Sequence, residues 1–283
     1  MTTVRTVRSR GRALAAGALV ACSLFAASSA QAAIVSTWSY TINSDFTSAT
    51  SENGNPFGGV FPRDTLSWGG TPGSSLVITE PTPQPLSVDT IIGGGFPAPA
   101  NIGLSSIITH NNFVIPLDGT ELKTAVLSGA VNLTPSNPPA GSFPGETIPV
   151  VRVLPFTIRF EETPNASNPC PTPGSPAGLC GDIFVLTSGL LNDSFVFDGQ
   201  TYFVNIFPTV QGALSQLQPQ TCAAAGAPAG CIGFTTPENQ STSLQFGFTV
   251  STDRLSVPEP GALALIGIAL LGFAGARRAA RRG

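Results

Sequence analysis

The residue types that could carry out chemistry are few in this chain, and histidine is the scarcest. His110 is the only histidine among 283 residues, so a Ser-His-Asp or Cys-His catalytic site would have to use it. No Gly-x-Ser-x-Gly nucleophile motif accompanies it. We therefore expect no catalytic residues. We expect a structural His110 whose ring nitrogens bond to loop carbonyls or to Asn111 and Asn112; contact with a ligand is the alternative.

Carboxylates offer a second kind of chemistry. Glu161 and Glu162 are adjacent, so on a strand they face opposite sides and cannot flank one glycosidic bond. Asp182, Asp193 and Asp198 stand near the ends of expected strands, where oxygen-rich loops can hold calcium. Their spacing fits no EF-hand, so turn capping is the preferred interpretation. No firm metal site and no cofactor are expected.

The five cysteines are compatible with an exported protein whose body contains disulfides. Cys22 lies in the N-terminal segment, which leaves Cys170, Cys180, Cys222 and Cys231 in the body. An even number of cysteines in an exported protein is typical of disulfides, and four allow three connectivities. We favour the pairs 170–180 and 222–231, because each closes one Gly/Pro-rich loop. Zinc is disfavoured, because the tight Cys-x-x-Cys pairs that it uses are missing.

Four large aromatic residues could stack on sugars if they were exposed: Trp38, Tyr40, Trp68 and Tyr202. Aromatic side chains of this size also dominate protein cores. We expect burial, with a carbohydrate-binding face as the alternative.

These residues must be positioned by strands. Trp38, Tyr40 and Ile42 alternate with polar residues, as do Phe156, Ile158 and Phe160, which is the period of a half-buried strand. Further strands are expected at 75–79 and 243–250. Asp198-Gly199 joins two apolar runs and predicts a tight hairpin. Residues 134–141 are expected to form a loop. With 57 Gly and Pro residues in total, residues 33–256 predict an all-β, antiparallel sandwich of about 8–12 strands with long Gly/Pro-rich loops.

The charges divide into three parts. Four arginines lie within residues 5–12 and four within residues 277–282, whereas residues 33–257 hold 5 basic and 15 acidic residues, a formal net charge of −10. An acidic body with one lysine cannot neutralise a run of phosphates. We therefore expect no nucleic-acid partner.

Residues 1–32 have the pattern of an export signal. Basic residues precede an apolar run, and Ala30-Gln31-Ala32 ends it as a cleavage site. Cleavage by signal peptidase is expected between Ala32 and Ala33. A lipid attached to Cys22, within Leu19-Val20-Ala21-Cys22, is the alternative.

Residues 257–283 combine three features. Val257-Pro258-Glu259-Pro260 is followed by the uncharged run 261–276 and then by Arg277, Arg278, Arg281 and Arg282. As a helix the run would span about 24 Å, which is short for a bilayer but able to insert with local thinning. The arginines should stay cytoplasmic, leaving the body outside the inner membrane. A membrane-anchored precursor with transient insertion is the prediction.

This arrangement resembles the PEP-CTERM sorting domain of Gram-negative bacteria. The resemblance implies processing near Pro258-Glu259-Pro260 by an exosortase, a membrane-bound cysteine protease–transpeptidase. It also implies a final place at the cell surface or in the extracellular matrix, together with exopolysaccharide.

The body has a second resemblance. Thr109-His110-Asn111-Asn112 precedes an apolar run, and 160–165, 180–185 and 233–236 follow downstream. The set is similar to the THxN family of PEP-CTERM proteins, named for the motif formed here by Thr109, His110 and Asn112. That resemblance implies placement rather than a reaction.

The expected function is that of an exported surface or matrix protein without catalytic activity. The alternative is a carbohydrate- or calcium-binding sandwich module. A hydrolase is disfavoured by the lone histidine.

Overall fold

The computed structural model describes residues 33–93, 97–165, 167, 169–176, 178–187, 192–209 and 214–254. Within these ranges the chain forms thirteen β-strands, one α-helix and two short 3-10 helices. The expected signal peptide 1–32 and sorting segment 257–283, with its apolar run 261–276, lie outside the described residues. No helix in the described ranges is long and apolar enough to span a membrane.

One antiparallel sheet has seven strands with β7 at its centre, and its longest pairing joins β1 to β6. The seven strands follow one another across the sheet in the order β11 (Ser215–Gln216), β12 (Ile232–Thr236), β8 (Asp182–Leu186), β7 (Val150–Glu161), β6 (Leu122–Asn137), β1 (Thr37–Ser51) and β4 (Leu86–Asp89).

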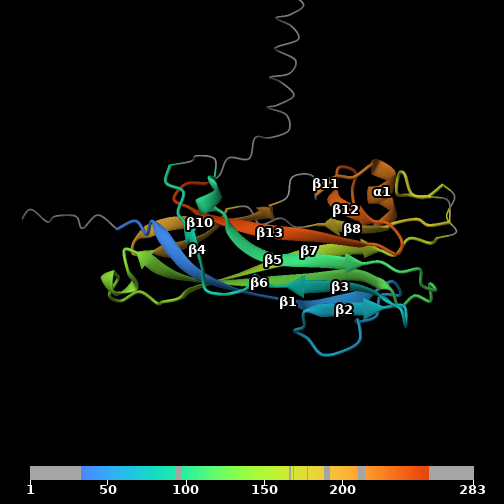
Figure 1. Cartoon of the computed structure of the whole chain (residues 1–283), viewed down its shortest axis with the longest axis horizontal. Helices are drawn as coiled ribbons and strands as arrows, with labels where there is room; N and C mark the ends of the chain where they lie inside the picture. The colour runs from blue at the N-terminus through green and yellow to red at the C-terminus, as the bar shows by residue number, and fades with distance from the viewer. Residues whose placement is uncertain are drawn as a thin grey trace, which may run out of the picture. The chain divides into compact units, whose positions relative to one another are not determined.

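The second antiparallel sheet has six strands, and β5 and β13 lie at its centre. Its order is β2 (Thr65–Trp68), β3 (Ser74–Thr79), β5 (Gly103–Asn111), β13 (Ser241–Ser251), β10 (Gln200–Pro208) and β9 (Asp193–Phe197). Chain neighbours β12 and β13 therefore belong to different sheets, so the segment 237–240 crosses from one sheet to the other (Figure 1).

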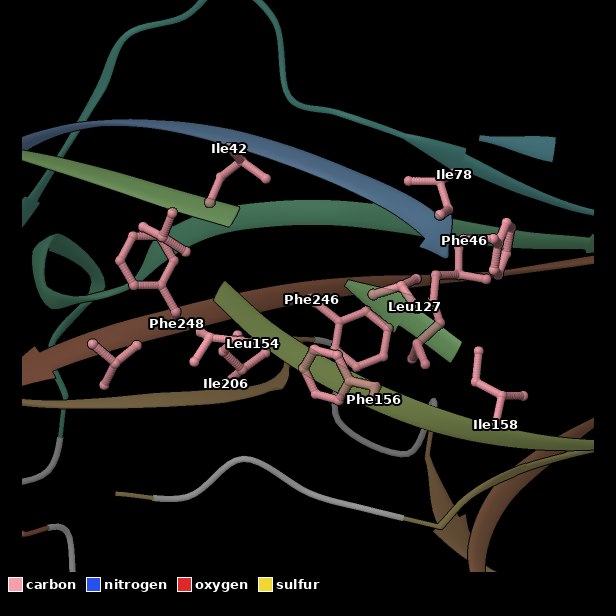
Figure 2. Packing of buried hydrophobic residues seen from close by; sticks show 14 of the residues in the cluster. Ile42, Phe46, Ile78, Leu127, Leu154, Phe156, Ile158, Ile206, Phe246 and Phe248 are labelled. Carbon is pink, nitrogen blue, oxygen red and sulfur yellow. The ribbon is translucent and has the colours of Figure 1, made fainter. Parts of the chain in front are cut away.

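The two sheets pack face to face around an apolar core. Alternate residues of β1 are buried, among them Trp38, Tyr40 and Ile42, as their spacing predicts. Figure 2 shows the interior, where Phe156 of β7 meets Phe246 of β13 with ring centroids 6.1 Å apart. This arrangement confirms the all-β sandwich. The strand number exceeds the expected 8–12, because β2, β4 and β11 are only four, four and two residues long and give no clear alternation.

The predicted hairpin is confirmed. β9 and β10 pair from Phe197 opposite Gln200, and the turn residues Asp198 and Gly199 have φ angles of 47° and 74°. Positive φ at both positions is what the tight hairpin turn requires, and glycine and aspartate adopt it readily.

The expected loop 134–141 is wrong at its beginning. β6 continues to Asn137, with Thr134 and Pro135 paired to β1. On its other side β6 pairs with β7 only as far as Leu133. Pro135 therefore has no partner on β7, so the N–H group that proline lacks is not needed on that side. Proline is tolerated in a strand at such a position.

Both favoured disulfides are present. Cys170 bonds to Cys180 and Cys222 bonds to Cys231. Cys222 lies in the helix α1 (Pro219–Ala224), which packs with Ala225 and Ala227 on Ile183 and Val185 of β8. The second disulfide thus holds α1 and this small satellite core against β8. Figure 1 shows α1 beside β8 and β12.

Candidate functional site

Three carboxylates meet at one edge of the interior. Glu162 follows the last residue of β7, Asp182 begins β8, and Glu238 lies in the segment that crosses from β12 to β13. One oxygen from each lies within 4.8 Å of the others, and the three residues are only 6%, 1% and 6% exposed. In the part of the chain that the structure describes, this is the one group of three or more His, Cys, Asp or Glu residues with such spacing.

The six-stranded sheet covers this carboxylate cluster with aromatic rings. Trp68 at the end of β2 donates its indole N–H to Glu162 Oε2 over 2.7 Å. The ring of His110 on β5 stacks on Trp68 with centroids 6.0 Å apart, and Phe160 of β7 meets both rings edge-on. His110 Nε2 lies 3.7 Å from Asp182 Oδ2, beyond hydrogen-bonding distance.

The predicted hydrogen bonds of His110 are wrong. Neither ring nitrogen has a hydrogen-bond partner among the described residues, and the residue is 1% exposed. Asn111 bonds instead to Ser75 and Ser241, and Asn112 donates to the carbonyl of Thr236 over 2.9 Å. The reason is the strand geometry. The His110 side chain points into the interior, where the rings of Trp68 and Phe160 pack against it and no loop carbonyl reaches its nitrogens.

Burial shapes the electrostatics of the site. Desolvation lowers the pKa of His110 to about 3, so the imidazole is neutral at pH 7. Desolvation also raises the pKa of Glu162 to about 7 and that of Asp182 well above its usual range, and it raises the pKa of Glu238. Repulsion from Glu238 and Glu121 also raises the pKa of Glu162, whereas its hydrogen bonds with Trp68 and Asp182 lower it. Repulsion from Glu162 and Glu238 also raises the pKa of Asp182.

Among the described residues, no lysine or arginine pairs with these three carboxylates. Lys123 pairs with Glu161 and Glu52, and Arg159 donates to the carbonyl of Gly226. Asp182 Oδ1 accepts the backbone N–H of Thr163, over 2.9 Å. A buried carboxylate group of this kind is costly unless protons or a cation neutralise it.

Oxygen atoms without partners surround the cluster. The described residues contain twelve buried side-chain nitrogen or oxygen atoms that make no hydrogen bond, and nine of them belong to the cluster or to residues next to it. The nine are both ring nitrogens of His110, both carboxylate oxygens of Glu238, and Asn112 Oδ1, Thr163 Oγ1, Asn165 Oδ1, Asp182 Oδ2 and Thr236 Oγ1. Buried polar atoms are normally satisfied, so this concentration requires an explanation.

Two of the three aspartates considered for calcium lie elsewhere. Asp193 pairs with Arg152, and Asp198 occupies the β9–β10 turn, both in the hairpin of the six-stranded sheet. Asp182 belongs to the other sheet. The set Asp182, Asp193 and Asp198 is therefore corrected: the structure joins Asp182 with Glu162 and Glu238 instead.

Sequence reasoning missed Glu162 and Glu238 as partners of Asp182. They stand 20 and 56 residues from Asp182, and neither forms a spacing motif with it. The only local signal was that the segments 109–112, 160–165, 180–185 and 233–236 resemble one family together. Each of these segments contributes to the cluster or to its wall, although Thr109 itself lies on the other face of β5 and bonds to Ser243.

The remaining predicted sites are placed as follows. Glu161 and Glu162 do face opposite ways, the first toward Lys123 and the second toward Trp68. The four large aromatics, Trp38, Tyr40, Trp68 and Tyr202, are buried, with 0–5% of their surface exposed. Ala33 begins the described body; Ala32, Val257–Pro260 and the terminal arginines lie outside the described residues.

The comparisons with known proteins concern the C-terminus. The class defined there is a protein-sorting signal: residues 256–279 match the PEP-CTERM protein-sorting motif. The chain is thus an exported protein that an exosortase processes, as the segment Val257–Pro260 predicts. The match includes Arg277 and Arg278 and ends before Arg281 and Arg282. A search of curated proteins found no match to the chain.

Proposed function

We propose that the processed body is a cell-surface or matrix protein without catalytic activity, associated with exopolysaccharide outside a Gram-negative cell. The observation that carries the proposal is the PEP-CTERM sorting motif at residues 256–279, which follows a disulfide-bonded all-β body. Disulfides of this kind persist in oxidising compartments. An acidic body also stays soluble there and avoids anionic membranes.

The burial of the reactive residues supports the absence of catalysis. The lone histidine is enclosed between Trp68 and Phe160, and its pKa of about 3 keeps it far from the range of a general base. The four cysteines of the body are bonded in pairs, which leaves no thiolate nucleophile among them. The acids that lie close together are shielded from substrate.

The position of the motif residues supports membership of the THxN family. His110 and Asn112 line the same cluster to which Glu162, Asp182 and Thr236 contribute, from the other segments on which the resemblance rests. If these four segments build one site, that shared site explains why they occur together in one family.

A carbohydrate-binding module is the second candidate. The four large aromatics are buried, so they do not form a stacking face. A surface hollow of about 310 Å³ beside β2 nevertheless combines amides and rings, with Asn53, Asn55, Phe57 and Trp68 in its wall. Amide groups with an aromatic floor suit sugar hydroxyls and C–H faces. Binding on a glycan array that Phe57→Ala and Asn55→Ala abolish would establish this candidate.

The sorting experiment tests the first proposal. The full-length chain is expressed in an exosortase-containing host, in the same host without exosortase, and in one that makes no exopolysaccharide. The expressed chain carries an epitope tag at its C-terminus, and we expect this tag to be lost only where exosortase is present. We expect the body to pass into the medium where exopolysaccharide is missing. Retention of the body on cells without exopolysaccharide would overturn the association. A glycosidase or protease activity that His110→Ala abolishes would overturn the absence of catalysis.

A further inference from the structure

The carboxylate cluster has the composition of a cation site. Glu162, Asp182 and Glu238 bring three carboxylates within 4.8 Å of one another in a place where they are at most 6% exposed. No lysine or arginine of the described residues pairs with any of the three. An acidic group alone is not a site, so a second observation is needed.

The second observation is a set of buried polar atoms without partners beside the cluster, with one of them, His110 Nε2, aimed at it. His110 and Asn112 are each 1% exposed; Nε2 of His110 faces Asp182 Oδ2 at 3.7 Å, and Oδ1 of Asn112 has no hydrogen-bond partner. The Asn112 side chain is held in place from its other end, because its amide nitrogen donates to Thr236 and its backbone N–H donates to Gln240. A carbonyl oxygen that is positioned and unpaired is a ready ligand.

We propose that Glu162, Asp182 and Glu238 bind one Ca²⁺ ion between the two sheets, with the amide oxygen of Asn112 as a further ligand. Calcium takes six to eight oxygen ligands in irregular geometry from carboxylates, amides and hydroxyls. The cluster offers such oxygens in number, and Thr163, Thr236 and Asn165 add unpaired ones beside it.

The donor set favours calcium over other metals. Zinc prefers cysteine and histidine in a tetrahedral arrangement, and here the cysteines are bonded and one histidine is present. Magnesium requires near-ideal octahedral geometry and keeps several waters, which a closely walled site does not favour. His110 stacks on Trp68 and lies nearest to a carboxylate, so we assign it a positioning role at the wall of the site.

The ion would join parts of the fold that are far apart in the chain. Its ligands come from the end of β7, the start of β8, the end of β5 and the crossing segment between β12 and β13. Of these, β7 and β8 belong to the seven-stranded sheet, β5 belongs to the six-stranded sheet, and the crossing segment connects the two sheets. Calcium would thus cross-link the two sheets, and the proposal is independent of the exopolysaccharide association.

Trp68 supplies a direct test, since its indole touches Glu162. The full-length chain is purified in detergent, freed of metal with EGTA, and titrated with Tb³⁺, whose luminescence a nearby tryptophan sensitises. We expect a luminescence signal that Ca²⁺ displaces, that survives in Trp38→Phe and that disappears in Trp68→Phe. Elemental analysis after dialysis against Ca²⁺ should give one more bound ion per chain than in Asp182→Asn.

Ligand variants and a matched control complete the experiment. Asp182→Asn, Glu238→Gln and Glu162→Gln should each weaken Ca²⁺ binding about 100-fold or more, since even outer-sphere partners cost about 10–100-fold. Asp64→Asn removes the same charge at an exposed residue outside the cluster and should change nothing. Near-ultraviolet circular dichroism monitors the fold of each variant.

Three outcomes would overturn the proposal. The first is a wild-type chain that binds no more Ca²⁺ than Asp182→Asn. The second is binding that Asp64→Asn abolishes as well. The third is a preference for Zn²⁺ that depends on His110, shown by its loss in His110→Phe. If the ligand variants do not fold, the Tb³⁺ signal of the wild type against that of Trp68→Phe still decides, because the site must lie beside that indole.

Discussion

The two tryptophans are both buried, but their indole N–H groups donate to different kinds of acceptor. Trp38 donates to Thr90 over 3.0 Å, Thr90 donates to the carbonyl of Val35, and the N–H of Val35 donates to the hydroxyl of Tyr202. Trp68 donates to Glu162, whose neighbours Asp182 and Glu238 have unpaired oxygens. We call the first the Trp38 network and the second the carboxylate cluster.

The difference teaches what each region needs for stability. Every step of the Trp38 network is a neutral hydrogen bond, and three aromatic rings, those of Phe195, Phe197 and Tyr202, meet Trp38 edge-on. Such a network contributes to stability without any added component. The carboxylate cluster concentrates like charges where water is scarce, so its stability depends on protons or on an ion.

The largest expected effect is that of Trp38→Ala. The side chain is fully buried, so its removal should cost about 3–5 kcal/mol of the free energy of unfolding. Urea unfolding measured by circular dichroism, with Ca²⁺ and with EGTA, checks it. The loss should be the same in both media, and a loss that depends on Ca²⁺ would show that the two regions are coupled. Trp38→Phe is the control, with a smaller loss.

Removal of calcium should act on the carboxylate cluster alone. At a Ca²⁺ concentration 100 times the dissociation constant, binding to the folded state should add about 2.7 kcal/mol to the free energy of unfolding. The same urea curves in Ca²⁺ and in EGTA measure this gain. Trp38→Phe should keep the full gain and Glu162→Gln should lose it. An equal gain in both variants would contradict a site at Glu162.

The two disulfides should contribute similarly to stability but differ in their effect on the carboxylate cluster. Their sequence separations are 10 and 9 residues, so loss of either by paired Cys→Ser substitution should cost a similar amount, about 2–3 kcal/mol. Cys180 precedes Asp182 by two residues, so loss of the first disulfide should also weaken Ca²⁺ binding. Loss of the second, which holds α1, should leave binding unchanged and serves as the control. Urea unfolding measures the stability of the two variants, and calorimetric titration measures their Ca²⁺ binding.

The smallest expected effect concerns Tyr202, in the Trp38 network. Tyr202→Phe removes the acceptor for Val35 and should cost about 1 kcal/mol at neutral pH. Burial raises the pKa of Tyr202, so the folded state holds the phenol proton more tightly than the unfolded chain does. Stability from this group is therefore present below about pH 10, the ordinary tyrosine pKa, and declines as the pH rises through the folded value.

The alkaline decline can be assigned by comparison of variants. Unfolding midpoints recorded between neutral pH and pH 11 should fall less steeply in Tyr202→Phe than in the wild type. Tyr40 adds to the decline, because burial raises its pKa to about 12. Asp64→Asn should leave the slope unchanged, because Asp64 is exposed and lies outside both regions; a changed slope there would contradict the assignment of the decline to the two tyrosines.

Much of the fold could be predicted from local patterns. Alternation at Trp38, Tyr40 and Ile42 indicated a half-buried strand, Asp198-Gly199 indicated a hairpin, and short Gly/Pro-rich loops indicated which cysteines pair. Each of these inferences depends on neighbours within about ten residues. The end of β6 was mispredicted, because whether Pro135 interrupts a strand depends on which side has a partner.

The candidate site could not be predicted in the same way. Asp182, Asp193 and Asp198 look alike in sequence, as acids at strand ends, yet only Asp182 lies in the interior beside other acids. His110 looked like a residue with loop partners, and the packing of two rings against it left it without any.

The sequence by itself determined the destination of this protein and the nature of its layers. Export and sorting signals are linear patterns that processing enzymes read directly, and strand alternation is a local consequence of backbone geometry. Only the tertiary structure decided that Glu162, Asp182 and Glu238 share one buried place beside His110. The physical reason is that the crossing of the chain from β12 to β13 and the packing of the two sheets, rather than spacing along the chain, set the distances between these charges.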